Sequence, residues 1–221
     1  MKCLMRPRAL RIVVFLGAVL LLQARSHAAG AGATVTFRKV FKQSSPEFIE
    51  IRVNESGAAT YDIRQLDEES SPQTLEIGAP LVRRIFDLTG KLRDFDGLDL
   101  DLHRRIANLG EKTFRYERGT ETHSVTFNFT LDDSARQLLD IFEGLARQQG
   151  DLMELRRTMR YDRLGVNDVV RQIEGDYDRS LLPEPGQLLP ALDQVAADEH
   201  FIDIARQRAR ALAARIRTSP R

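Results

Sequence analysis

The chain of 221 residues carries 33 basic and 32 acidic side chains, for a formal net charge of +1, and contains one cysteine. This near balance by itself says nothing about nucleic-acid or lipid partners. Loss of a basic leader, however, would leave an acidic product with no general attraction to phosphate backbones or anionic lipids, which disfavours nucleic-acid binding. A single cysteine excludes a disulfide framework and zinc sites built from several thiolates.

The first 28 residues are typical of a secretory signal peptide. A cationic start without acids, 1–11, precedes an uninterrupted apolar run, 12–22. The run is shorter than the ~20 residues of an ordinary membrane-spanning helix. Ser26 and Ala28 fit the small-residue positions that a signal peptidase requires. We therefore predict export to the periplasm or the cell exterior, with cleavage near Ala28. A mitochondrial transit peptide and an uncleaved anchor are the alternatives.

Cleavage near Ala28 would change the chemistry of the chain. Five basic residues and Cys3, the only cysteine, would leave with the leader. The remainder would keep 28 basic and 32 acidic residues, a net charge of −4. Such a product has no thiolate nucleophile and no thiol redox chemistry. Its length of roughly 190 residues is sufficient to bury a core without disulfides.

Residues 34–97 predict strands followed by a helix. Alternating polar and apolar side chains predict strands at 34–42, 49–53, 59–64 and around Leu75, with a turn at 54–57. From Leu81 the apolar residues recur every three or four positions, which predicts a helix that ends before Gly97. A second, short helix is expected from Asp101 to Leu109, with Gly110 as its stop.

The next segment repeats the order of hairpin and then helix. Strands are predicted around 114–117 and 124–129, joined by a glycine turn. Asp132 or Asp133 is expected to cap a helix, and Gly150 to end it. Because the hairpin–helix unit occurs twice, an internal duplication is one interpretation. Independent burial of two helices on one core is the other.

The C-terminal segment predicts a helical region. Asp151 is expected to open a new helix through a capping box with Glu154, and the proline-rich stretch 180–190 is the best candidate for a linker. Two antiparallel helices are expected after it. We therefore predict an α+β domain over 34–149, with helices on one face of an antiparallel sheet of about five to six strands. An α-helical region, 151–221, follows.

No motif in the chain assembles a catalytic site, and the sequence predicts no catalytic, cofactor-binding or metal-binding residue. The histidines after the leader, His103, His123 and His200, are scattered over three elements. His123 is the first candidate for catalysis because it shares a strand face with Val125. Its ordinary interpretation is a half-exposed side chain at a strand end, since no acid lies at a catalytic spacing.

Two groups of charged residues have ordinary interpretations as well. The aspartates around Gly97 are Asp94, Asp96, Asp99 and Asp101. Their spacing is not that of a calcium loop, so a solvated acidic loop is expected. The arginines of 156–163 and 206–217 have acidic neighbours, which predicts solvated helix faces with local ion pairs. Binding of an acidic partner is the alternative for these arginines.

Three stretches of the chain resemble segments in a group of uncharacterised exported bacterial proteins. They are KTFRYE at 112–117, FNFT at 127–130 and RYDRLG at 160–165. The resemblance extends over most of the chain after the leader. The resemblance implies export, but it does not imply an activity, a substrate or a functional site.

The sequence therefore predicts an exported, non-catalytic binding protein that contacts another protein through the open sheet face or the terminal helices. One alternative is an exported hydrolase whose carboxylate and histidine groups meet only in the fold. Another is an envelope protein held by an uncleaved leader. No cofactor and no nucleic-acid partner are expected. Contact with a membrane is expected only if the leader stays uncleaved. The oligomeric state is left open.

Overall fold

The computed structural model describes residues 32–218, so the predicted signal peptide lies outside the described residues. It contains a six-stranded antiparallel sheet and five α-helices, which confirms the α+β prediction. The strands are β1 Thr34–Val40, β2 Phe48–Asn54, β3 Ala58–Arg64, β4 Gln73–Glu76, β5 Glu111–Arg118 and β6 Glu121–Phe127. The α-helices are α1 Ala79–Lys91, α2 Asp133–Tyr161, α3 Val166–Asp178, α4 Leu189–Ala197 and α5 Asp203–Thr218, with short 3-10 turns η1 Arg93–Phe95 and η2 Pro185–Leu188.

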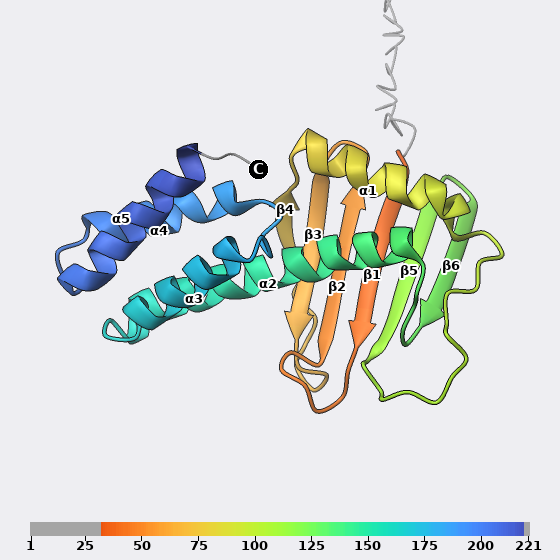
Figure 1. Cartoon of the computed structure of the whole chain (residues 1–221), viewed down its shortest axis with the longest axis horizontal. Coiled ribbons are helices and arrows are strands. Elements are labelled where there is room, and N and C mark those ends of the chain that lie inside the picture. The colour runs from red at the N-terminus through yellow and green to blue at the C-terminus, as the bar shows by residue number, and fades with distance from the viewer. Residues whose placement is uncertain (1–31, 219–221) are drawn as a thin grey trace, which may run out of the picture. The chain divides into compact units, whose positions relative to one another are not determined.

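The sheet has the order β4-β3-β2-β1-β5-β6, so the first strand lies in its interior (Figure 1). Phe37 of β1 pairs with Ile51 of β2 on one side and with Phe114 of β5 on the other. All three side chains are fully buried. This row fixes the register, because a slip of one residue would turn each apolar side chain to the opposite face.

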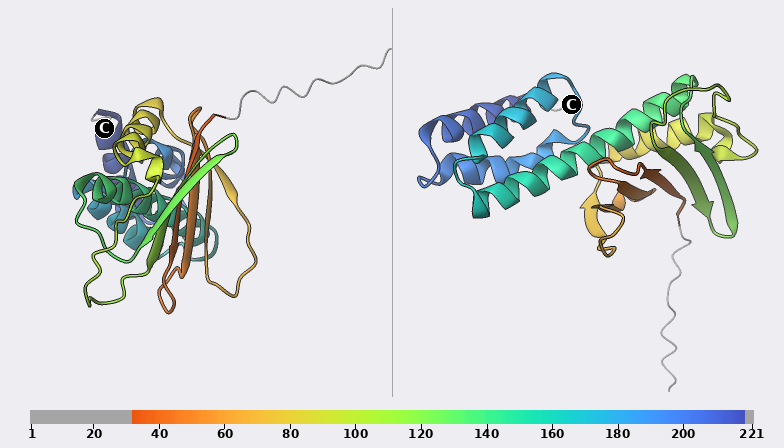
Figure 2. Two further views of the ribbon diagram at one scale, coloured as in Figure 1. Left: turned by 90° about the vertical axis from the view of Figure 1, so that its right-hand side faces the viewer. Right: turned by 90° about the horizontal axis from the view of Figure 1, so that it is seen from below.

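Helices α1 and α2 cover one face of the sheet and leave the other open (Figure 2). The Phe37 and Phe142 rings stack with centroids 5.4 Å apart, which joins β1 to α2. Asp132 begins α2 as predicted, since its carboxylate accepts a hydrogen bond from the Ala135 N–H at 2.8 Å. This bond satisfies one of the free donors at the helix start.

The prediction that Gly150 ends this helix is wrong, because α2 runs through it for 29 residues. Asp151 consequently lies inside the helix and does not cap a new one. A helical glycine costs about 1 kcal/mol relative to alanine. Burial of Leu145 before it and of Leu152 and Leu155 after it outweighs that cost.

The apolar residues form two clusters that divide within α2. One cluster extends from the sheet to Ala146, and the other begins at Leu152 and includes α3, α4 and α5. The two predicted C-terminal helices are present and pack on each other. The stretch 180–190 is not an open linker, because Leu182 and Leu188 are buried in the second cluster. Among residues 32–218, no helix has both the length and the apolarity needed to cross a membrane.

The predicted helix from Asp101 to Leu109 is also wrong, because this segment is an irregular loop. The Asp101 carboxylate accepts a hydrogen bond from the Asn128 N–H at 2.9 Å, and the Asn128 side chain bonds the backbone of Ala107 and Leu109. Ile106 and Leu109 stay 39% and 43% exposed, so no buried face holds a helix here.

Candidate functional site

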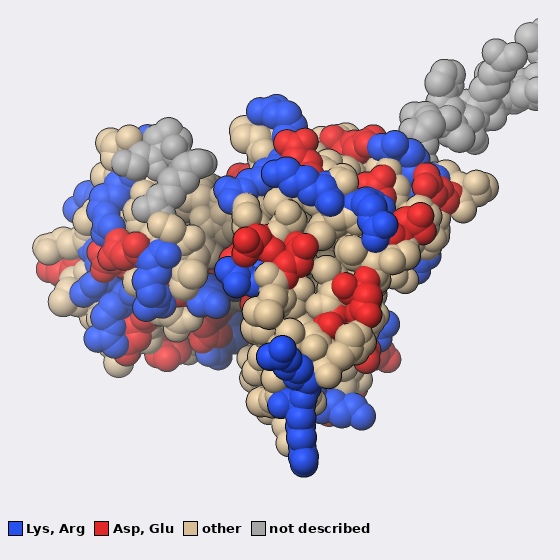
Figure 3. All heavy atoms as spheres, turned by 45° about the vertical axis from the view of Figure 1, so that its right-hand side comes forward, with Lys and Arg blue, Asp and Glu red and all other residues tan. Residues whose placement is uncertain are grey.

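A groove of about 640 Å³ lies between α1, α2 and the connector 180–184 that leads from α3 to η2. Its lining residues come from segments far apart in sequence: Gly78, Pro80, Leu81, Arg84, Gln137, Asp140, Ile141, Glu143, Gly144, Arg147 and residues 180–184. Basic and acidic side chains are interspersed over the face of the molecule in Figure 3. The groove is more enclosed than the hollow of about 650 Å³ over β1 to β4.

Two glycines allow the connector to approach both helices. A Cβ on Gly144 would lie 2.8 Å from Pro183 Cγ and 2.9 Å from the Leu181 carbonyl oxygen. A Cβ on Gly78, which precedes α1, would lie 2.9 Å from a carboxylate oxygen of Glu184. A larger residue at position 144 would push the connector outward and change the shape of the groove, whereas at position 78 only the Glu184 carboxylate would have to move.

Glu184 closes the groove at the start of α1. Its carboxylate accepts a hydrogen bond from the Gly78 N–H at 3.1 Å, where the free donors of the helix attract negative charge. Burial raises the pKa of Glu184, and the Gly78 hydrogen bond opposes this rise only in part. The wall of the groove therefore contains a half-buried carboxylate that already accepts a backbone hydrogen bond.

Three glutamines connect the groove to the edge of the sheet. The buried Gln148 and Gln149 side chains donate to the Gln187 side-chain oxygen at 2.8 and 2.9 Å. Gln187 in turn donates to the Glu76 carbonyl of β4 at 2.8 Å, and Gln148 accepts from the Glu184 N–H. This network joins β4, α2 and the connector. Sequence reasoning missed it, although two adjacent glutamines inside an apolar helix stripe are a signal, because buried amides need partners.

The rim of the groove carries charges without partners in the described chain. Arg84 of α1 and Asp140 of α2 are both exposed, and neither makes an ion pair or a hydrogen bond within residues 32–218. Glu143 differs, because it pairs with Lys39 at 2.6 Å. Arg84 and Asp140 are thus the two charged groups of the rim that are free to bind a ligand.

Behind the groove, two buried carboxylates face each other between α2 and α3. Asp176 pairs with Arg179 at 2.6 Å and with the groove residue Arg147 at 3.5 Å. One Asp151 oxygen accepts a hydrogen bond from Gln172 at 3.0 Å, and the other is buried without a hydrogen-bond partner in the described chain. Burial, reinforced by the charge of Asp176, raises the pKa of Asp151 to about 6. This side chain therefore holds or releases a proton near neutral pH.

His123 lies outside the groove, at the edge of the sheet. Its Nε2 is 3.7 Å from a Glu121 oxygen, and its side chain is 24% exposed. It lines neither of the two hollows described for residues 32–218. The acid beside His123 is Glu121, which is 53% exposed on the same strand, so the pair lies at the sheet edge and not in either of these two hollows.

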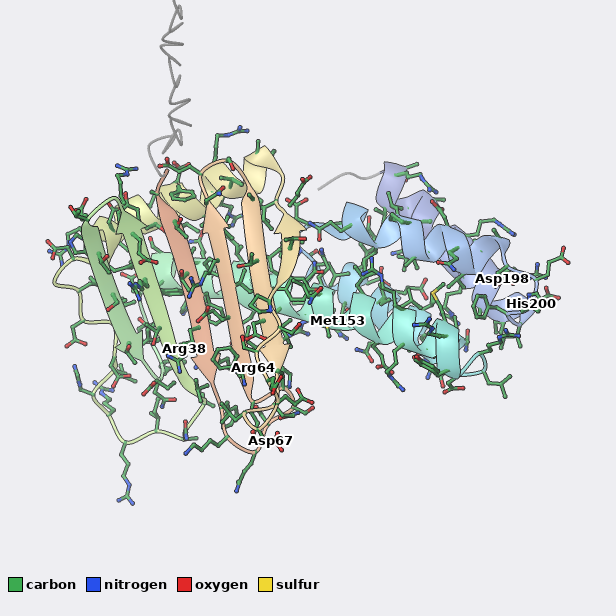
Figure 4. All side chains as sticks on the ribbon, turned by 180° about the vertical axis from the view of Figure 1, so that it is seen from behind. Arg38, Arg64, Asp67, Met153, Asp198 and His200 are labelled. Carbon is green, nitrogen blue, oxygen red and sulfur yellow. The ribbon has the colours of Figure 1, made fainter. Side chains whose placement is uncertain are left out.

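The other histidines pair with acids in their own loops. His103 Nε2 is 2.6 Å from Asp99, and the hydrogen bond to Asp99 is the main reason why the pKa of His103 is raised. His200 Nδ1 is 2.7 Å from Asp198, and both lie at the end of the helical region (Figure 4). Over residues 32–218, no three acidic, histidine or cysteine side chains form a group able to hold a metal ion.

The acidic loop around Gly97 does not assemble into one site. Asp99 binds His103, whereas the Asp101 carboxylate accepts hydrogen bonds from the backbone at Asn128. The pKa of Asp101 is lowered, chiefly by that Asn128 N–H. His103 lies between the two, with its Nδ1 3.9 Å from the Asp101 carboxylate, so these aspartates support the loop and the end of β6.

The open face of the sheet, the other predicted contact surface, satisfies most of its charges internally. Three arginines pair with an acid two positions away on the same strand: Arg52 with Glu50, Arg64 with Asp62 and Arg115 with Glu117. Arg38 and Arg64 lie over the Phe48 ring (Figure 4), with centroid distances of 5.5 and 4.4 Å. A shallower hollow of about 650 Å³ lies over β1 to β4. Its charged lining residues are Arg52, which pairs with Glu50, and Glu76, whose carboxylate has no partner within residues 32–218.

No protein-family model matches the chain, and a search of curated proteins finds no match. The functional interpretation therefore depends on the geometry and the chemistry of the residues themselves.

Proposed function

We propose that the chain is an exported, non-catalytic binding protein whose groove between α1, α2 and the connector receives a segment of another protein. The observation that carries this proposal is the combination of an apolar lining with unpartnered charges of opposite sign on the rim. Leu81 and Ile141 contribute the apolar lining, and Arg84 and Asp140 the charges. The pattern of residues 1–28 supports the exported location.

A protein segment fits this chemistry. Burying apolar side chains of the segment against Leu81 and Ile141 supplies affinity at about 25 cal/mol per Å² of area removed from water. Charges on the rim contribute mainly to the choice of partner and to its orientation. Ligand sites commonly occupy roughly 300–1,000 Å³, and the groove falls in that range at about 640 Å³.

The state of the groove carboxylates favours binding over hydrolysis. Glu184 is bonded to the Gly78 N–H, and Glu143 is paired with Lys39. This leaves Asp140 as the only lining carboxylate without a partner in the described chain. Acid–base hydrolysis requires a proton donor and an acceptor that act on the same bond, and a single exposed aspartate does not supply both.

Two neighbouring arginines provide a matched test. Arg83 and Arg84 are adjacent on α1 and both exposed, but only Arg84 lines the groove. We expect a photo-crosslinking residue at position 84 to capture a discrete partner in the producing cell, and one at position 83 to capture none. In the wild-type background, R84E is expected to weaken recovery of that partner, and R83E to leave it unchanged.

Equal crosslinking from positions 83 and 84, or no adduct from either, would count against the groove as a binding site. The exported location has its own measurement, the mass of the purified product. A product beginning near residue 29 supports cleavage after Ala28, whereas an intact precursor contradicts it.

A further inference from the structure

The two edges of the sheet are protected to very different degrees. β4 has four residues, follows Pro72, and its Glu76 carbonyl accepts a hydrogen bond from Gln187. β6 has seven residues, and no hydrogen bond from outside the sheet reaches its backbone within residues 32–218. Unpaired strand edges are templates for pairing with another strand, so proteins usually block them.

The turn before β6 determines which of its backbone groups are free. β5 and β6 are joined by a two-residue turn in which Gly119 has a φ of +60°, and Arg118 faces Glu121 across it. The two residues that flank such a turn form a pair joined by backbone hydrogen bonds. Hydrogen-bonded and non-hydrogen-bonded pairs then alternate along an antiparallel ladder. The N–H and C=O groups of Thr122, Ser124 and Thr126 therefore point away from β5.

The side chains of β6 contain none of the features that usually prevent a strand edge from pairing with another strand. No residue from Thr122 to Phe127 carries a formal charge at neutral pH, apart from the ionisable His123. Lysine or proline on the strand would block the edge, and neither is present. The strand itself is exposed at Thr122, Ser124 and Thr126. The edge thus combines free backbone groups with uncharged side chains.

We propose that β6 pairs antiparallel with β6 of a second copy of this chain, about a twofold axis at Ser124. In this register Ser124 faces its own counterpart, and Thr122 faces Thr126 of the second copy. Glu121, the only acid of the strand, faces Phe127, so no like charges oppose each other. The strand is therefore complementary to itself, as a twofold interface requires.

The dimer is independent of the proposed binding groove. β4, which the groove network reaches through Gln187, is the edge of the sheet opposite β6. Each copy would keep its groove accessible, so the assembly would be bivalent toward a repeated or oligomeric partner. A strand edge buries less than ~1,200 Å², the size at which association is weak. We therefore expect dissociation constants of about 1 µM to 1 mM.

Cysteine substitution tests the register directly. In the full chain with Cys3→Ser, Ser124→Cys is expected to form a crosslinked dimer with a short bifunctional thiol reagent, since Cα atoms of a bonded pair lie ~5.5 Å apart. Thr126→Cys is the matched control, because Thr126 is exposed on the same face of the same strand. Its two copies would lie on opposite sides of the axis, so we expect no crosslink. Equal crosslinking at both positions, or none at Ser124, overturns the proposal.

A charge exchange provides a second measurement. By sedimentation velocity, wild type is expected to associate between about 1 µM and 1 mM, while Ser124→Lys and Ser124→Glu each remain monomeric. Mixing the two variants should restore association, because opposite charges then meet at the axis. Circular dichroism checks that both variants fold. A monomeric wild type, or self-association of Ser124→Lys equal to that of wild type, contradicts the proposal. Arg84→Glu is expected to leave association unchanged, which separates this result from the groove experiment.

Discussion

Replacing Asp151 with asparagine isolates the effect of one buried ionisable group. Asp151 is 5% exposed and lies beside Asp176, and its hydrogen-bond donor Gln172 is on α3. Asparagine keeps the shape and can still accept from Gln172. It also adds an N–H that can donate to Asp176, as a protonated aspartic acid would. The variant therefore mimics the protonated side chain at every pH.

The size and sign of the effect follow from the pKa of Asp151, which is about 6 in the folded protein and 3.8 for an ordinary aspartate. At ~1.36 kcal/mol per pKa unit, this corresponds to about 3 kcal/mol as an upper limit. The folded state binds the proton more tightly, so wild-type stability falls as the pH rises from about 4 to about 6. Asparagine does not ionise. D151N should match wild type near pH 4 and exceed it by up to about 3 kcal/mol at pH 8.

Urea unfolding at pH 4 and pH 8 measures this difference between the two proteins. Asp140→Asn is the control, because Asp140 is an exposed aspartate of the same helix without a described partner. We expect it to change the free energy of unfolding by less than about 0.5 kcal/mol at either pH. If D151N gained no more stability at pH 8 than at pH 4, the assignment of Asp151 as a buried, partly protonated group would be refuted.

Three further substitutions test the shape of α2 and of the loop beside β6. Gly150→Ala should stabilise the protein by about 0.5–1 kcal/mol, because the added Cβ would meet no atom within 4 Å. A loss of stability in urea unfolding would contradict a continuous α2. Gly144→Ala, in the same helix, should cost about 1–3 kcal/mol in that assay because of the contact with Pro183, and an unchanged stability would contradict the close approach of the connector. Asn128→Ala removes the hydrogen bonds to Ala107 and Leu109. Trypsin should then cleave after the loop arginines faster than in wild type, as measured by mass spectrometry. An unchanged cleavage rate would contradict this anchoring of the loop.

The sheet could be predicted from the sequence because its signals are local. Val125 and Phe127 alternate with polar residues, and the structure buries both on the helix side. The turn after β2 has a local cause as well, since the Asn54 side chain accepts a hydrogen bond from the Ser56 N–H. Hydrogen bonds and burial patterns within a few residues are sufficient for such elements.

The wrong predictions concern positions where distant residues override a local signal. Gly150 would end many helices, but apolar residues on both sides of it are buried in two different clusters. Asp101 has the chemistry of a helix cap, yet its carboxylate bonds the backbone at Asn128. Both outcomes depend on contacts between segments far apart in the chain, which periodicity does not contain.

The groove could not be predicted for a related reason. Arg84 and Asp140 resemble ordinary surface residues of two amphipathic helices, and nothing local indicates that the connector 180–184 forms a groove with both helices. Only Gln148 and Gln149 gave a usable signal, as polar residues at positions where the helix buries its side chains. The signal peptide lies outside the described residues and stays a prediction, as does the duplication of the hairpin–helix unit.

The continuity of α2 connects the wall of the groove mechanically to the second apolar cluster. Twenty-nine residues at ~1.5 Å each make a rod of about 43 Å. One stretch of it lines the groove at Asp140, and another is fixed in the second cluster by Leu152 and Leu155. A partner that tilts the groove wall must therefore also displace α3 to α5. Binding in the groove would then change the rates of amide hydrogen exchange in the terminal helices, far from the groove.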